Sequence, residues 1–138
     1  MLSFSFPDVL HEQGEIERVA GEFAGENPHI FLAKFLECSK NKQLTTLDEH
    51  MWSKLENTDS YNIQVGGWDV VAQHAVEGHA ENPRDWKSLK QRIESAEMLD
   101  APIVCQKGDR LHLVSGNTRL MVARALGKSP QVLLVKID

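Results

Sequence analysis

Residues 110–126 have the sequence Arg-Leu-His-Leu-Val-Ser-Gly-Asn-Thr-Arg-Leu-Met-Val-Ala-Arg-Ala-Leu, and Gly127 follows them. The alternating apolar run at the start of this stretch predicts a strand. The segment 120–126 consists largely of strong helix formers, and glycine is a typical residue just after a helix end. The stretch therefore predicts a strand, a glycine turn and a helix in that order, which indicates an α/β fold.

The turn between these two elements consists of Ser115, Gly116, Asn117, Thr118 and Arg119. Glycine adopts backbone conformations that a side chain forbids, and serine or asparagine caps a new helix. The unpaired N–H groups of the first helical turn, the helix dipole and the arginine guanidinium all favour a phosphate there. These five residues are the candidate binding site. The alternative is a plain connecting turn, and the five residues taken alone favour it, because such turns are common.

The segments around this turn predict the remaining strands of a small sheet. The run Pro102–Cys105, a turn at 107–109 and the run Leu111–Val114 predict a hairpin, and 131–137 predicts a buried last strand. Further upstream, Asn82-Pro83 predicts the start of an amphipathic helix. The pattern of 58–80 is weaker: 61–65 alternates like a strand, and 68–76 fits either a helix or a strand, with a helix over 69–77 as the preferred interpretation.

The first 57 residues predict a helical layer. Helical spacing predicts helices over 8–24, 28–39 and 47–57, after a short alternating run at 2–6 that fits an edge strand. Asn27-Pro28 is a cap followed by proline, and Thr46–Glu49 has the pattern of a capping box. We therefore expect a single domain, 1–138, in which the N-terminal layer 1–57 packs on a core formed by 58–138.

The C-terminal part, about 84–138, resembles the nucleotide-binding core of ParB N-terminal domains, sulfiredoxin and the free serine kinases. The shared features are an upstream helix, a Pro-Ile-Val strand, a hairpin, a turn of Gly-x-x-Arg type, a helix that ends in Leu-Gly and a final strand. The resemblance implies a ParB/sulfiredoxin-like core with a small mixed sheet. It also implies that Gly116, Asn117, Thr118 and Arg119 hold the phosphates of ATP, ADP or CTP, with Mg²⁺. The resemblance thus reverses the preference for a plain turn.

The chain departs from each of these families at residues of the turn, which limits the family functions that it can share. Sulfiredoxin has its reactive cysteine in this turn, where Asn117 stands here, and the single Arg119 differs from the paired arginines of ParB. The serine kinases begin the turn with an acid, where Ser115 stands here. A nucleotide-dependent phosphotransferase, hydrolase or switch is the first hypothesis, with unknown catalytic residues. The second is a non-catalytic interaction or inhibitor protein that keeps the fold and docks a protein partner through its N-terminal helices.

Most of the other candidate side chains are better explained by structural roles than by a functional site. The group His74, Glu77, His79 and Glu81 matches no zinc spacing, so no metal site is expected. Trp52 and Trp86 lie on apolar helix faces, which indicates core packing, whereas Trp68 follows two glycines and is a candidate for a site. Cys38 and Cys105 have no metal-ligand or Cys-x-x-Cys spacing, which predicts reduced core residues.

The composition limits the partners. The chain has 138 residues, 41% of them hydrophobic and 25% charged, and a formal net charge of −5. An acidic total argues against strong nonspecific binding to nucleic acid. Neither a membrane span nor a signal peptide is recognisable, so we expect no membrane partner and a cytoplasmic location.

Overall fold

The computed structural model describes residues 9–40, 44–56, 100–116, 119–120, 123–124, 127 and 129–137. It contains helices and a mixed five-stranded sheet with the order β1-β5-β3-β4-β2, so the expected mixed α/β class is confirmed. The predictions for the runs 2–6, 61–65, 69–77 and the helix after Asn82-Pro83 lie outside the described residues. So do those for Trp68, Trp86 and the histidines and glutamates of 74–81.

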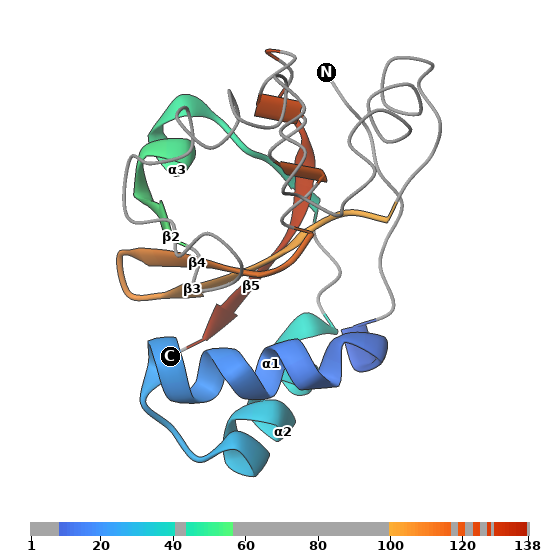
Figure 1. Ribbon diagram of the computed structural model, residues 1–138, viewed down its shortest axis with the longest axis vertical. Coiled ribbons are helices and arrows are strands. Elements are labelled where there is room, and N and C mark those ends of the chain that lie inside the picture. The colour runs from blue at the N-terminus through green and yellow to red at the C-terminus, as the bar shows by residue number, and fades with distance from the viewer. Residues whose placement is uncertain are drawn as a thin grey trace, which may run out of the picture.

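The sheet is built around a hairpin. Strands β3 (Ile103–Lys107) and β4 (Arg110–Ser115) pair antiparallel, and Gly108 at the tip has φ 62°, a conformation that glycine adopts without strain. Strand β5 (Gln131–Ile137) runs parallel to β3 on its other side. The predicted hairpin and the predicted last strand are both confirmed, and Figure 1 shows them as the orange and red arrows.

One face of the sheet is covered by the N-terminal helices. A 3₁₀ turn η1 (Val9–Glu12) leads into α1 (Gln13–Val19) and a π-helical turn η2 (Ala20–Ala24), and α2 (Pro28–Ser39) follows. The predicted helices over 8–24 and 28–39 are therefore confirmed. Asn27 caps α2 as expected, because its side chain accepts hydrogen bonds from the N–H groups of His29 and Ile30.

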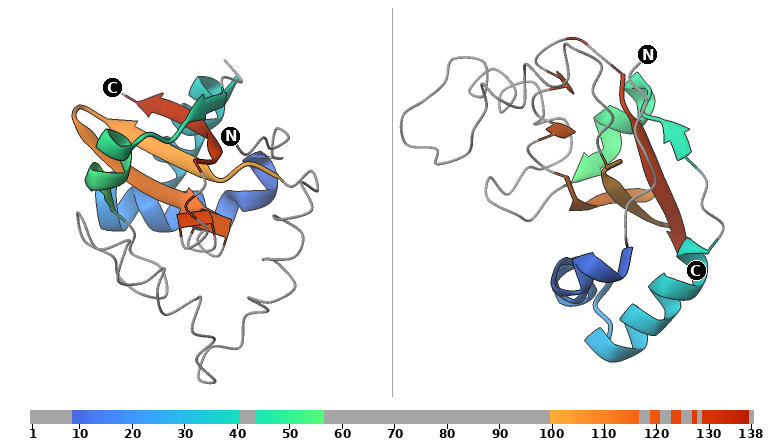
Figure 2. Two further views of the ribbon diagram at one scale, coloured as in Figure 1. Left: turned by 90° about the horizontal axis from the view of Figure 1, so that it is seen from above. Right: turned by 90° about the vertical axis from the view of Figure 1, so that its right-hand side faces the viewer.

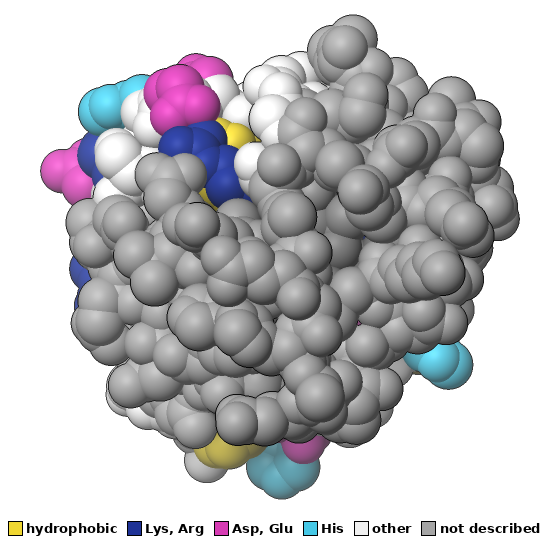
Figure 3. All heavy atoms as spheres, turned by 45° about the horizontal axis from the view of Figure 1, so that its top comes forward, with side chains coloured by type: hydrophobic (Ala, Val, Ile, Leu, Met, Phe, Trp, Pro, Cys, Tyr) yellow, Lys and Arg dark blue, Asp and Glu magenta, His cyan; other side chains and the backbone are white. Residues whose placement is uncertain are grey.

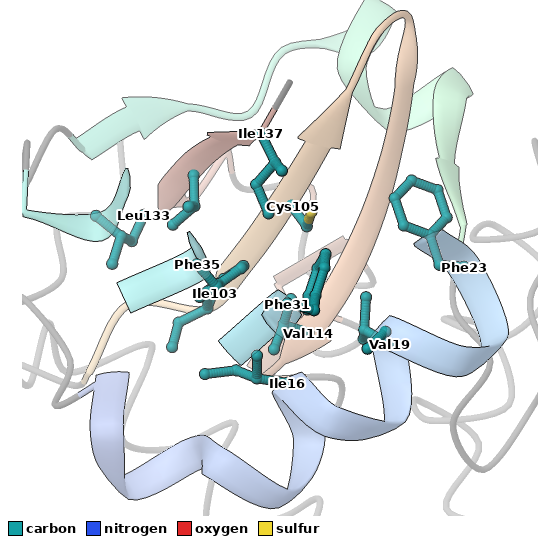
Figure 4. Packing of buried hydrophobic residues seen from close by; sticks show 12 residues of the cluster. Ile16, Val19, Phe23, Phe31, Phe35, Ile103, Cys105, Val114, Leu133 and Ile137 are labelled. Carbon is teal, nitrogen blue, oxygen red and sulfur yellow. The ribbon is translucent and has the colours of Figure 1, made fainter. Parts of the chain in front are cut away.

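The helical spacing of the N-terminal layer buries its apolar stripe against the sheet. Figure 4 shows Ile16 and Val19 of α1 and Phe31 and Phe35 of α2 directed toward Val114 and other apolar side chains of the strands. All four helix residues have no exposed surface. Burial of large apolar side chains on this scale is the main force that holds the layer on the sheet.

The other face carries α3 (Glu49–Lys54) and the helical positions 119–120 and 123–124. Trp52 is only 3% exposed and packs with Leu120 and Ala123 over the strands, as expected for a core residue. Figure 2 shows α1 and α2 on one side of the sheet and α3 on the other. Arg124 joins these elements through two hydrogen bonds to the carboxylate of Glu49, 2.7 and 3.2 Å long. Basic and acidic side chains lie together over this part of the surface (Figure 3).

Two predictions for 44–57 were wrong. Leu44–Thr46 form strand β1, paired antiparallel with β5, and Leu55–Glu56 form strand β2, paired parallel with β4. The helix predicted over 47–57 is therefore shorter, and both edges of the sheet come from the N-terminal part, in which helices were expected after residue 8. The cap is Asp48, whose side chain accepts from the N–H of Met51. Thr46 lies in β1, so the predicted capping box does not form.

Candidate functional site

The candidate site lies where β4 ends and the next helix begins. Ser115 is the last residue of β4, and Gly116 has φ 103°. The N–H of Leu120 donates to the carbonyl of Gly116 at 3.0 Å, which closes the first turn of the helix. The predicted order of strand, glycine turn and helix is therefore confirmed at the described positions. Asn117 and Thr118, the other two predicted site residues, lie outside them.

The structure explains why residue 116 is a glycine. A Cβ built at this position would lie 2.6 Å from Cβ of Pro102 and 2.8 Å from its Cα. Both the positive φ and this close approach require glycine. Residues with a side chain rarely adopt such a backbone conformation, and Cβ atoms essentially never lie so close to other heavy atoms. The need for glycine was predictable from the sequence, but Pro102 as its neighbour was not.

Arg119 stands in the first turn of the helix, as predicted, and reaches across to the start of β3. Its Nη1 donates to the backbone carbonyl of Asp100 at 2.7 Å. The guanidinium thus links the helix start to the segment that enters the neighbouring strand. The contact shows that Arg119 helps to hold these two segments together at the same end of the sheet as Ser115 and Gly116.

A second arginine, Arg18 of α1, approaches the same end of β4 from the opposite face. Its Nη2 lies 3.5 Å from the carbonyl oxygen of Val114, and its Nε donates to Glu15 at 3.0 Å. The pairing of β3 with β4 shifts register between Ile103 and Val104, which leaves Val114 as the extra residue of a bulge. Bulges disturb the regular ladder and are frequent near functional sites. The guanidinium of Arg18 thus contacts Val114, the residue that precedes the turn. No sequence motif singles out Arg18.

The sequence contained no signal for this convergence. Arg18 and Ser115 are separated by most of the chain, and only the packing of α1 on β4 brings them to the same end of the sheet. An arginine on a helix that also carries Glu15 three residues earlier is usually part of a solvated ion pair. The side chain of Arg18 is only 20% exposed here, so it is partly held between α1 and the sheet.

The cysteines lie away from the turn and are suited to packing. Cys105 is buried in β3, and desolvation raises the pKa of its thiol to about 12 against the opposing effect of Lys107. Cys38 in α2 is half-buried, and both cysteines are free. Since the thiolate is the reactive form, Cys105 is not set up as a nucleophile.

The part of the chain that the structure describes contains no group of three His, Cys, Asp or Glu side chains suited to a metal ion. Among the same residues, no helix has the length and apolar character needed to cross a membrane.

Comparison with known proteins found no match: no protein-family model, no curated protein and no solved structure resembles the chain closely enough to count.

Proposed function

We propose that this chain is a ParB/sulfiredoxin-like protein that binds a phosphate group, as part of a nucleotide, at the turn 115–119. The observation that carries the proposal is the position of two guanidinium groups at the same end of the sheet: that of Arg18 reaches the carbonyl of Val114, and that of Arg119 reaches the carbonyl of Asp100. Guanidinium groups match the geometry of phosphate oxygens, and the N–H groups of a helix start add further donors.

The chemistry proposed for the bound phosphate is charge stabilisation. Arg119 already donates to the carbonyl of Asp100, so phosphate binding requires its guanidinium to share its donors or to turn from that carbonyl. A nucleoside triphosphate or diphosphate (ATP, ADP or CTP) with Mg²⁺ is the proposed ligand class. Phosphoryl transfer or hydrolysis is the reaction that such a site supports, and no residue is assigned a catalytic role in it.

Calorimetric titration tests this proposal. Wild-type protein is titrated with ATP, ADP and CTP, each with and without Mg²⁺, and the same titrations are made with Arg119→Gln and Arg18→Gln. We expect saturable binding to wild type and a loss of about tenfold or more in affinity for Arg119→Gln, because a charge-assisted contact is removed. Arg124→Gln is the matched control, since Arg124 lies on the same helix and pairs with Glu49. Equal affinity in Arg119→Gln and wild type contradicts the proposed site.

A second candidate function is favoured by the exposed apolar residues of the helical layer. Ile30 of α2 is 65% exposed and Leu10 of η1 is 58% exposed. Apolar side chains of this size on a helical surface suit a protein partner. This candidate is an interaction or inhibitor protein without nucleotide chemistry. If folded wild-type protein binds none of the three nucleotides, that result favours this candidate over the first proposal.

A further inference from the structure

Most positive side chains of the described residues have a partner within the chain. Of the nine Lys and Arg side chains described, six bind a carboxylate and Arg119 binds the carbonyl of Asp100. The remaining two, Lys54 and Lys136, make neither kind of contact with any described residue. They come from different elements, α3 and β5, and both line the same hollow.

The hollow lies on the sheet face that carries α3, close to the tip of the hairpin. Gln106 of β3 is in register with Leu111 of β4 on one side and with Lys136 of β5 on the other. These three side chains therefore lie side by side across the sheet, and α3 forms the opposite wall with Met51 and Lys54. The hollow is open to solvent on one side and has a volume of about 260 Å³.

The lining combines an apolar floor with a positive rim. Met51, Leu111 and Leu134 provide the floor, and each also packs in or against the core of this face. Lys54 and Lys136 stand at the rim with the ring of His50, while Asp109 of the hairpin turn is the carboxylate among the lining residues. Two lysines against one aspartate leave a net positive charge at the rim.

We propose that this hollow binds a small organic anion, with the apolar body on the leucines and the anionic group between Lys54 and Lys136. Known ligand sites have this construction, in which an apolar lining gives the affinity and a few polar groups fix the orientation. A volume of about 260 Å³ is slightly below the usual range for drug-sized ligands, so it suits a small body of one or two rings. An anion placed there would supply the partner that neither lysine has among the described residues.

A second hollow, of about 590 Å³, lies on the other face of the hairpin and is less suited to an anion. Its cations are already engaged: Lys107 binds Glu26 and the carbonyl of Ala24, and Arg110 binds Glu56. Arg110 also lies over the ring of Phe23 at 4.5 Å. A ligand anion would have to compete with these carboxylates, whereas Lys54 and Lys136 pair with no carboxylate of the described part of the chain.

The proposed anion site is separate from the turn 115–119. Strands β3 and β4 join at Gly108 and Asp109, so the hairpin tip and Ser115 lie at opposite ends of the sheet. The two proposals therefore stand or fall independently. Variants of Lys54 and Lys136 leave the turn intact, and variants of Arg119 leave the hollow intact.

The test uses 2-naphthoate, which has two rings and a carboxylate, with neutral 2-naphthamide and inorganic phosphate as comparison probes. Affinities are measured by calorimetry and by NMR shifts of the full chain. We expect wild type to bind 2-naphthoate at least about tenfold more tightly than 2-naphthamide, and more tightly than phosphate. Equal affinity for the charged and neutral probes, or no saturable binding of naphthoate, overturns the proposal.

Variants locate the binding. Lys54→Gln with Lys136→Gln should weaken naphthoate binding about tenfold and leave the affinity for naphthamide unchanged. Lys40→Gln is the control, because Lys40 is an exposed lysine on α2 that pairs with Glu37. Circular dichroism confirms that each variant is folded. Unchanged naphthoate affinity in the folded double variant, or an equal loss in Lys40→Gln, contradicts the site.

Discussion

Gly116 is the single residue whose replacement the structure penalises most clearly. Its φ of 103° and the 2.6 Å approach to Pro102 both oppose a side chain. We expect Gly116→Ala to lower the free energy of unfolding by about 1–3 kcal/mol and Gly116→Val to lower it more. Urea unfolding measures both changes.

Gly14 provides the matched control for this experiment. It lies in α1 with nothing within 4 Å of an added Cβ, so Gly14→Ala should leave stability unchanged or raise it by up to about 1 kcal/mol. Equal effects at the two glycines would show that the contact with Pro102 is not the cause. The stability loss at Gly116 is expected whether or not the turn binds phosphate, so nucleotide affinity must be measured alongside it.

Cys105 should resist thiol reagents in the folded protein. Its pKa of about 12 leaves only about one thiol in ten thousand ionised at pH 8, and the side chain has no exposed surface. We expect Cys38, which is half-buried, to react with Ellman's reagent first and Cys105 to react only as the chain unfolds. Cys38→Ala isolates the slow reaction. Rapid labelling of folded Cys38→Ala would contradict the assignment of Cys105 to the core.

At the scale of elements, Glu26 connects α2 with the hairpin. Its carboxylate binds Lys34 at 3.1 Å and Lys107 at 3.3 Å, and the hydrogen bond from Lys34 is the main cause that lowers the pKa of Glu26, against the opposing effect of burial. A pKa lowered by folding stabilises the folded state above the unfolded pKa. That contribution is lost as the pH falls through the lower, folded-state pKa.

We therefore expect Glu26→Gln to lower the free energy of unfolding at pH 7 by about 0.5–1 kcal/mol. The difference from wild type should shrink as the pH falls from 5 toward 3, because both chains are then neutral at this position. Glu37→Gln is the control, since the pair of Glu37 with Lys40 is exposed on both sides and should contribute almost nothing. A difference for Glu26→Gln that stays constant with pH would exclude an electrostatic role.

The sequence predicted elements well wherever the signal is local. The cap at Asn27, the helix α2, the hairpin with Gly108 and strand β5 all depend on neighbouring residues, and they form as expected. Strands β1 and β2 have three and two residues, too few for a periodic pattern. Their pairing depends on partners far along the chain, such as Leu111 for Leu55, and no local rule predicts such a contact.

The same distinction applies to the sites. The turn at Ser115 and Gly116 and the position of Arg119 in the first helical turn were predictable because they follow one another in sequence. The approach of Arg18 and the shared hollow of Lys54 and Lys136 were not, because each depends on elements that meet only in the folded chain. The sheet order is likewise a property of the fold and not of any segment.

At the scale of the whole molecule, β5 joins the N-terminal part to the hairpin. Leu133 pairs with Leu44 of β1 on one side and Ile103 of β3 on the other, and it is only 2% exposed. We expect Leu133→Ala to lower the free energy of unfolding by about 2–4 kcal/mol through the cavity it leaves. The control is Lys136→Ala in the same strand, which should change it by less than about 0.5 kcal/mol because Lys136 is exposed. Similar costs for both would contradict the burial of Leu133 in the core.

The position of β5 between β1 and β3 also sets the order in which the sheet is completed during protein synthesis. Strands β1, β3 and β4 all leave the ribosome before residue 131, but β1 and β3 share no edge and each pairs with β5. Until the last strand has emerged, the nascent chain presents an unpaired edge of β3 flanked by apolar side chains. Unpaired edges of this kind are sites of association with other chains. The interval between the emergence of residue 107 from the ribosome and that of residue 137 is therefore the one in which a holding chaperone would protect this chain most.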